Sequence, residues 1–261
     1  FRRVLFRSLL TQGQAKIYAG RTDPAPFDEA ATRALAAADD PLAVEAYARW
    51  VFARARTAQP STEAAAMYEA LGRRLGARGR FARALLWHNQ GIARLVALDL
   101  DGARARFRQA ADEAASAPEL ELTTIGHSLA NVEPTPAASL ARMEATYARY
   151  VARLGPAHGL TRTMRLYLAE MTPDRDRARA LIGDCGDVPI RATCLRARAW
   201  LLDEDGDRAG AAAALAAYPD DHSPFTPVAR AYVALATPGG DAATARRALA
   251  ALAEAPAQGS W

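Results

Sequence analysis

The chain has 261 residues, enough for one or two domains, its formal net charge is +4 at pH 7, and 51% of its residues are hydrophobic, which suffices for a sizeable core. Alanine is the commonest residue, only 7% of residues are aromatic, and β-branched residues are scarce, a mixture that favours close-packed helices over sheets. No run approaches the roughly 20 apolar residues of a membrane span, so a membrane-spanning protein is excluded and a cytoplasmic location is expected.

Residues 1–8, FRRVLFRS, lie outside the pattern that follows. They resemble one reading frame of a common short-read sequencing adapter, which translates residue for residue to this octapeptide. We therefore expect them to be non-native and the natural N-terminus to be missing; a natural origin is the alternative. Arg2, Arg3 and Arg7 supply three of the four net positive charges, so the rest of the chain is nearly neutral and no direct binding to nucleic acid is expected.

From residue 9 onward, apolar residues recur with the helical period, and short turns separate the periodic segments. The predicted helices span residues 9–20, 27–38, 41–57, 61–76, 80–97, 101–116, 118–131, 136–153, 157–171, 174–184, 188–203, 207–218, 224–236 and 241–254. This pattern predicts an all-α fold of about seven helical hairpins, with a repeat array at residues 9–255 and a C-terminal tail at residues 256–261.

Capping signals support these helix starts. In four places a side-chain oxygen precedes a proline that can occupy the first helical turn: Asp40-Pro41, Thr135-Pro136, Thr172-Pro173 and Ser223-Pro224. Ser116-x-x-Glu119 also has the spacing of a capping box.

The clearest hairpin lies between Phe81 and Ala115. Its first helix is apolar on two sides, and its second has a single apolar stripe that includes Ala103 and Phe107. A pair that is apolar on two sides needs further pairs to cover it, which predicts that similar hairpins flank this one.

The pattern of this hairpin recurs along the chain. A small residue near the start of each second helix is found at Ala30, Ala64, Ala103, Ala138, Ala178, Ala211 and Ala245. The residue one turn later is Ala34, Tyr68, Phe107, Arg142, Ile182, Leu215 and Leu249. Only Arg142 breaks the apolar pattern, and Met143 or Leu140 is expected to take its place in the core.

Five residues of the central hairpin carry a family resemblance: Trp87, Gly91, Ala103, Phe107 and Ala110. Their types and spacing are similar to those of the tetratricopeptide repeat (TPR) family. Phrases such as LDLDGARARFRQA also resemble the degenerate repeats appended to bacterial LuxR-type ATP-binding regulators and signalling kinases. The resemblance implies a bacterial protein with a right-handed α-α superhelix, which binds a protein or peptide on a concave face formed by the first helix of each pair.

On that register the concave face carries polar residues interleaved with aromatic ones, and these residues form the predicted peptide-binding groove. They are Arg49, Arg56, His88, Asn89, Thr123, His127, Asn131, Thr163, Tyr167, Glu170, Arg196, Trp200, Asp203 and Arg230. Arginine binds carboxylates through two parallel hydrogen bonds, so we expect a ligand with acidic groups or a free C-terminus. The alternative is that these residues are ordinary solvated positions.

No motif predicts catalysis, a cofactor or a metal. Lys16 lacks the glycine-rich setting of a phosphate loop, and the four histidines lack the spacing of zinc ligands. The acidic turn around Asp205 lacks the glycine and the closing glutamate of a calcium loop, which favours a helix-capping role. Ser128 directly follows His127, and adjacent helical residues point about 100° apart, so the two cannot form a catalytic triad.

The two cysteines, Cys185 and Cys194, are too few and too close in sequence to indicate a disulfide framework. We therefore expect both to be reduced, as in an intracellular protein, with Cys185 packed in the core.

These observations predict a non-catalytic helical-repeat scaffold that binds another protein or a peptide. The alternative is a C-terminal regulatory or sensor segment of a larger, truncated protein, such as a transcription activator or a signalling kinase. An enzyme built on an α-solenoid is a third, disfavoured class.

Overall fold

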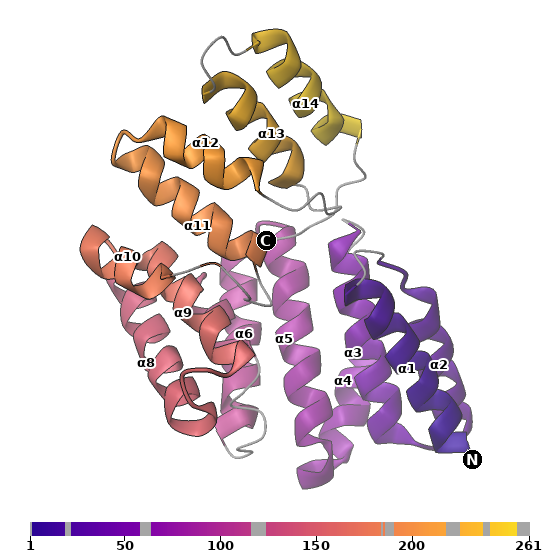
Figure 1. Cartoon of the computed structure of the whole chain (residues 1–261). Helices are drawn as coiled ribbons and strands as arrows, with labels where there is room; N and C mark the ends of the chain where they lie inside the picture. The colour runs from indigo at the N-terminus through magenta and orange to yellow at the C-terminus, as the bar shows by residue number, and fades with distance from the viewer. Residues whose placement is uncertain are drawn as a thin grey trace. The chain divides into compact units, whose positions relative to one another are not determined.

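The computed structural model describes residues 2–18, 22–57, 64–115, 124–183, 185, 191–217, 225–236 and 241–254. Within these residues every regular element is a helix, which confirms the all-α prediction (Figure 1). The helices are α1 (Arg2–Tyr18), α2 (Ala25–Ala36), α3 (Asp40–Arg56), α4 (Ala65–Arg74), the 3-10 helix η1 (Gly76–Gly79), α5 (Arg80–Val96), α6 (Leu100–Ala115), α7 (Ile125–Ala130), α8 (Pro136–Leu154), α9 (Gly159–Met171), α10 (Arg175–Ile182), α11 (Arg191–Glu204), α12 (Arg208–Ala216), α13 (Phe225–Ala236) and α14 (Ala242–Glu254). None of the helices in the described ranges is both long and apolar enough to cross a bilayer.

The capping predictions succeed in part. Thr135 accepts a hydrogen bond from the Ala138 amide at 3.2 Å and caps α8 as predicted. Thr172 does not cap α10, because its hydroxyl donates back to the Leu168 carbonyl at 2.7 Å, and Asp174 caps the helix instead. The signals at Ser116 and Ser223 lie outside the described residues.

The chain divides into two compact units. Unit 1 runs to Val132 and contains α1 to α7, and unit 2 begins at Glu133 and contains α8 to α14. The boundary falls inside the fourth predicted hairpin, so α7 and α8 belong to different units. A single array over residues 9–255 stays a prediction.

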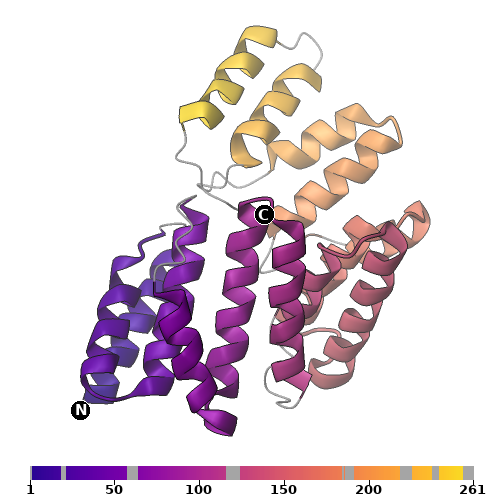
Figure 2. The same cartoon turned by 180° about the vertical axis from the view of Figure 1, so that it is seen from behind.

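In unit 1 the helices pack in sequence order around one hydrophobic core. Helix α3 contacts α2, α4 and α5, and α5 in turn contacts α6 (Figure 1 and Figure 2). The core contains Phe27, Tyr47, Tyr68, Trp87 and Phe107. The ring of Phe107 is fully buried.

Gly91 explains why the central hairpin needs a small residue on α5. A Cβ atom at this position would lie 2.4 Å from Cε1 of Phe107, closer than any real contact. The glycine therefore lets α5 and α6 approach each other closely around the buried ring.

Most of the predicted repeat positions are buried. The buried members are Ala30, Ala34, Tyr68, Ala103, Phe107, Ala178, Ile182, Ala211, Leu215 and Ala245. Ala64 is an exception, because it is exposed and left-handed just before α4. At the fourth position Met143 is fully buried, which confirms that it takes the place of Arg142 in the core. Arg142 pairs with Glu133.

Three turns between helices have the same backbone conformation and hydrogen bond. In each, a left-handed residue precedes an aspartate whose amide donates to the carbonyl five residues back. The left-handed residues are Ala38 (φ 53°), Leu98 (φ 60°) and Gly206 (φ 82°). The hydrogen bonds join Asp39 to Ala34 at 2.9 Å, Asp99 to Arg94 at 2.9 Å and Asp207 to Leu202 at 2.8 Å. Only the third turn uses glycine, so the first two hold an L-residue where left-handed geometry costs about 1–2 kcal/mol.

The prediction of reduced cysteines is wrong. Cys185 and Cys194 form a disulfide with their Cα atoms 5.6 Å apart, inside the core of unit 2. Cys185 follows α10 and Cys194 lies in the first turn of α11, so packing of these two helices brings the cysteines within bonding range. The cysteines therefore give no support to a reducing compartment.

Candidate functional site

The two residues at the centre of the predicted groove are not exposed. His88 is 7% exposed and Asn89 is 5% exposed, so the expectation that they face a ligand is wrong. Asn89 donates to the Ala48 carbonyl of α3 at 2.8 Å, and His88 contacts Ser128 of α7. Because α5 is covered by helices on both sides, its polar residues join neighbouring helices.

His88 and Ser128 form a pair that resembles a nucleophile and its base. Nε2 of His88 lies 2.9 Å from Oγ of Ser128. Burial lowers the pKa of His88 to about 4, which keeps the ring neutral and makes it a weak base. Ser128 is only 8% exposed, so the geometry favours a structural tie between α5 and α7.

The other predicted residues near this pair lie on α7 or beside it. His127 is half-buried and Asn131 is exposed. Nδ2 of Asn131 lies 3.3 Å from Nε2 of His127. Burial also lowers the pKa of His127 to about 4. Thr123 lies outside the described residues.

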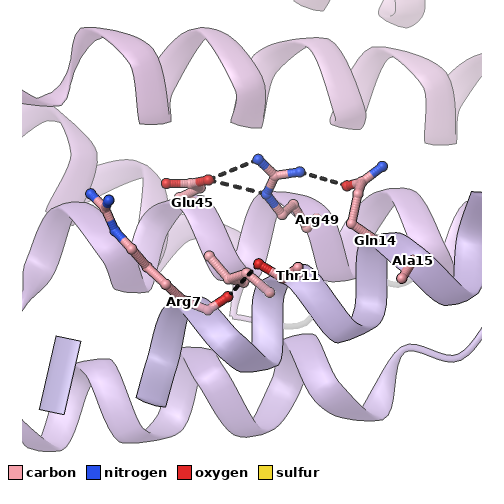
Figure 3. Close-up of a pocket in the computed structure, with 7 residues that line it drawn as sticks. Arg7, Thr11, Gln14, Ala15, Glu45 and Arg49 are labelled. Atoms are coloured by element: carbon pink, nitrogen blue, oxygen red, sulfur yellow. Dashed lines mark hydrogen bonds and ion pairs between the residues drawn. The ribbon is translucent and has the colours of Figure 1, made fainter. Parts of the chain in front are cut away.

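Arg49 faces a pocket of about 470 Å³ between α1 and α3 (Figure 3). Its guanidinium donates to Glu45 at 2.8 and 3.1 Å and to Gln14 at 2.6 Å. The pocket is also lined by Arg7, which belongs to the octapeptide that resembles an adapter translation. Because the guanidinium of Arg49 is already engaged by Glu45 and Gln14, this pocket is the weaker candidate.

Arg56 lies apart from Arg49, at the end of α3. Its guanidinium lies 5.8 Å from the ring centroid of Phe52, and burial lowers the pKa of Arg56. Its buried Nε has no hydrogen-bond acceptor within the described part of the chain. The structure therefore does not bring the two arginines of α3 into one site.

Arg83 is a structural residue that the sequence analysis missed. It donates to both oxygens of Glu113 at 2.6 and 2.8 Å, and to the carbonyls of Gly72 and Gly76 at 2.9 and 2.6 Å. It therefore ties α5 to α6 and to the end of α4. A signal was present, because Arg83 lies one helical turn before Trp87 and so shares its buried face.

Unit 2 brings together four predicted residues from consecutive first helices. Glu170 of α9 and Arg196, Trp200 and Asp203 of α11 line a pocket of about 450 Å³. The remaining lining residues are Ala197, Ala199, Leu215 and Tyr232, from α11, α12 and α13. Trp200 is 40% exposed, so apolar surface in the pocket remains open to a ligand.

The polar groups of this pocket form two pairs. Arg196 donates to Oε1 of Glu170 from Nη2 at 2.6 Å and from Nε at 3.1 Å. Tyr232 donates its hydroxyl to Oδ1 of Asp203. Burial and this hydrogen bond raise the pKa of Tyr232 to about 12, so the phenol stays protonated.

Three predicted residues of unit 2 are absent from the pocket lining. Tyr167 is half-buried on α9, and burial together with the charge of Glu170 raises its pKa. Thr163 donates to the Gly159 carbonyl at 3.0 Å, and Arg230 is exposed on α13.

The acidic turn after α11 has the capping role that the sequence predicted. Asp207 accepts a hydrogen bond from the Gly210 amide at 2.8 Å, and Asp205 pairs with Arg175 and Arg179. Across the residues that the structure describes, no three His, Cys, Asp or Glu side chains are grouped as metal ligands.

Comparisons with protein families, with curated proteins and with solved structures found no match to this chain.

Proposed function

We propose that the chain is a non-catalytic helical-repeat scaffold of the TPR type that binds a segment of another protein. The observation that carries this proposal is the pocket of unit 2, where Trp200, a residue that is 40% exposed, lies among apolar side chains and paired polar groups. Tryptophan is enriched among the residues that dominate binding energy in protein interfaces.

The helix contacts support a superhelical arrangement. Helix α3 contacts α5, and α9 contacts α11, so first helices of consecutive predicted hairpins pack against each other. In a superhelix these helices form one continuous wall, and Glu170, Arg196 and Trp200 would lie on it.

The proposal can be tested by panning the full chain against a phage-displayed library of random peptides. We expect the wild type to enrich a peptide family, and Trp200→Ala to weaken binding of these peptides by at least about tenfold. Leu235→Ala is the matched control, because Leu235 is a 61% exposed apolar residue of unit 2 outside the pocket lining. Circular dichroism would verify that both variants stay folded.

Equal binding by Trp200→Ala and the wild type would overturn the pocket as the binding site. Failure to enrich any peptide family would overturn peptide binding itself.

A further inference from the structure

The pocket of unit 2 holds more negative than positive charge. Its lining contains two carboxylates, Glu170 and Asp203, and one guanidinium, that of Arg196. Arg196 is paired with Glu170, and their side chains are 39% and 28% exposed. Arg208 approaches Asp203 only at 4.0 Å and does not line the pocket. The carboxylate of Asp203 is therefore the less neutralised of the two.

The contacts that join these side chains reach one oxygen of each carboxylate. Both hydrogen bonds from Arg196 go to Oε1 of Glu170, and the contacts from Tyr232 and Arg208 go to Oδ1 of Asp203. An ionised carboxylate can accept about four hydrogen bonds, so both groups retain capacity for a donor from a ligand.

The aromatic residues of the lining also favour a positively charged ligand. A cation within about 6 Å of an indole face is attracted by the ring quadrupole, and tryptophan is the best of the aromatic residues for this contact. The methylene stem of a basic side chain would pack on Ala199 and Leu215 while its charged head remains near the carboxylates. Tyr232 adds a second aromatic ring to the lining.

An acidic ligand would meet the opposite conditions. It would have to compete with Glu170 for Arg196, and it would lie near the carboxylate of Asp203. The guanidinium of Arg196, which was the reason to expect an acidic ligand from the sequence, already donates to Glu170 of the same unit.

We infer that this pocket binds a basic side chain, that of lysine or arginine, carried by a peptide segment of the partner protein. This inference rests on the proposed function, and it gives the ligand the opposite charge to the one expected from the sequence. Asp203, Glu170 and Trp200 are the residues that would recognise the cation.

The test uses the peptides enriched by the full chain, with binding measured by fluorescence anisotropy. We expect a lysine or arginine at one fixed position of the family, and replacement of that residue by norleucine or citrulline should weaken binding by about tenfold. On the protein, Asp203→Asn should weaken binding by about fivefold, because the amide keeps an acceptor for Tyr232 but removes the charge.

Glu204→Gln is the matched control for Asp203→Asn. Glu204 is the next residue of α11, lies outside the pocket lining and pairs with Arg175 at 3.5 Å. The Glu204→Gln substitution therefore removes one negative charge close to Asp203 but outside the pocket, and binding should stay within about twofold of the wild type.

Enrichment of acidic or neutral peptides would overturn the inference, as would equal affinities for Asp203→Asn and the wild type. If the binding of such acidic or neutral peptides still depended on Trp200, the proposed function would stand and only the inference about the charge of the ligand would be overturned. Loss of the Trp200 dependence would overturn both.

Discussion

Unit 1 and unit 2 use their polar side chains in opposite ways. In unit 1 the polar residues of α5 lie between helices, where His88 and Asn89 bond to Ser128 and Ala48. In unit 2 the polar residues of α11 lie at a pocket, where Arg196 and Asp203 flank an open indole. Both helices are first helices of predicted hairpins, so position in the repeat does not decide whether a polar residue is buried between helices or lines a pocket. Cover by neighbouring helices decides it.

The two units also differ in how their cores are held. Unit 1 has one continuous cluster centred on large aromatic side chains, whereas the described core of unit 2 includes smaller clusters of aliphatic residues and a disulfide. The units should therefore respond to different perturbations.

Removal of the Phe107 ring should cause the largest loss. Phe107→Ala should lower the free energy of unfolding by about 3–5 kcal/mol, because the ring is fully buried against Gly91 and near His88. Urea denaturation would measure the loss, and amide hydrogen exchange would assign it to unit 1. Phe81→Ala is the control, because Phe81 is 41% exposed and should cost less than about 1 kcal/mol. Equal costs would contradict the assigned core.

Reduction of the disulfide should affect unit 2 alone. Opening the bond between Cys185 and Cys194 should cost about 2–4 kcal/mol, because the unfolded chain regains conformational freedom. Hydrogen exchange with and without dithiothreitol should show faster exchange in α9 to α11 and no change in unit 1. A Cys185→Ala/Cys194→Ala variant should be insensitive to the reductant. Detection of two free thiols in the denatured wild type, before any reductant is added, would show that the bond is absent.

Mild acid should weaken unit 1 through its buried imidazole. Burial lowers the pKa of His88 from 6.5 to about 4, so between these values the unfolded chain binds more protons than the folded chain. Stability should therefore be complete above pH 6.5 and fall by about 2–3 kcal/mol as the pH approaches 4. His127 contributes with the same sign.

Urea unfolding at pH 7 and pH 4.5 would measure this effect. His88→Gln removes one titrating group, so its loss between the two pH values should be smaller than that of the wild type. An equal loss would mean that His88 does not carry the pH dependence.

The smallest expected effect is a gain at a turn. Leu98 has φ 60° and is 83% exposed, so Leu98→Gly should relieve backbone strain and stabilise unit 1 by about 1 kcal/mol. Leu100→Gly is the control, because Leu100 is exposed within α6 and has no left-handed backbone to relieve. A thermal melt that placed both variants at or below the wild type would contradict the strain at Leu98.

The sequence predicted the helices well because their signals are local. Helical periodicity, the cap at Thr135 and the small residue Gly91 each depend on residues within a few turns. The predicted boundaries therefore lie close to the observed ones for most helices, such as α5 and α13.

The sequence predicted the candidate site less well, because the burial of a side chain depends on helices that are distant in sequence. The helical phase of His88 is compatible with an exposed wall, but His88 is buried and contacts Phe107 of α6 and Ser128 of α7, which lie 19 and 40 positions later. The sequence did not predict the disulfide for the same reason, since the distance between the two cysteines depends on how α10 packs on α11. Trp200, Arg196 and Asp203 were predicted together because all three lie on α11 one turn apart.

The disulfide also changes what a single cut in the chain would do. Arg191 lies between Cys185 and Cys194 and is exposed at the start of α11. A protease that cleaved after Arg191 would break the polypeptide but leave both fragments covalently joined. The nicked protein would migrate as one species in a denaturing gel and separate into two only after a thiol was added.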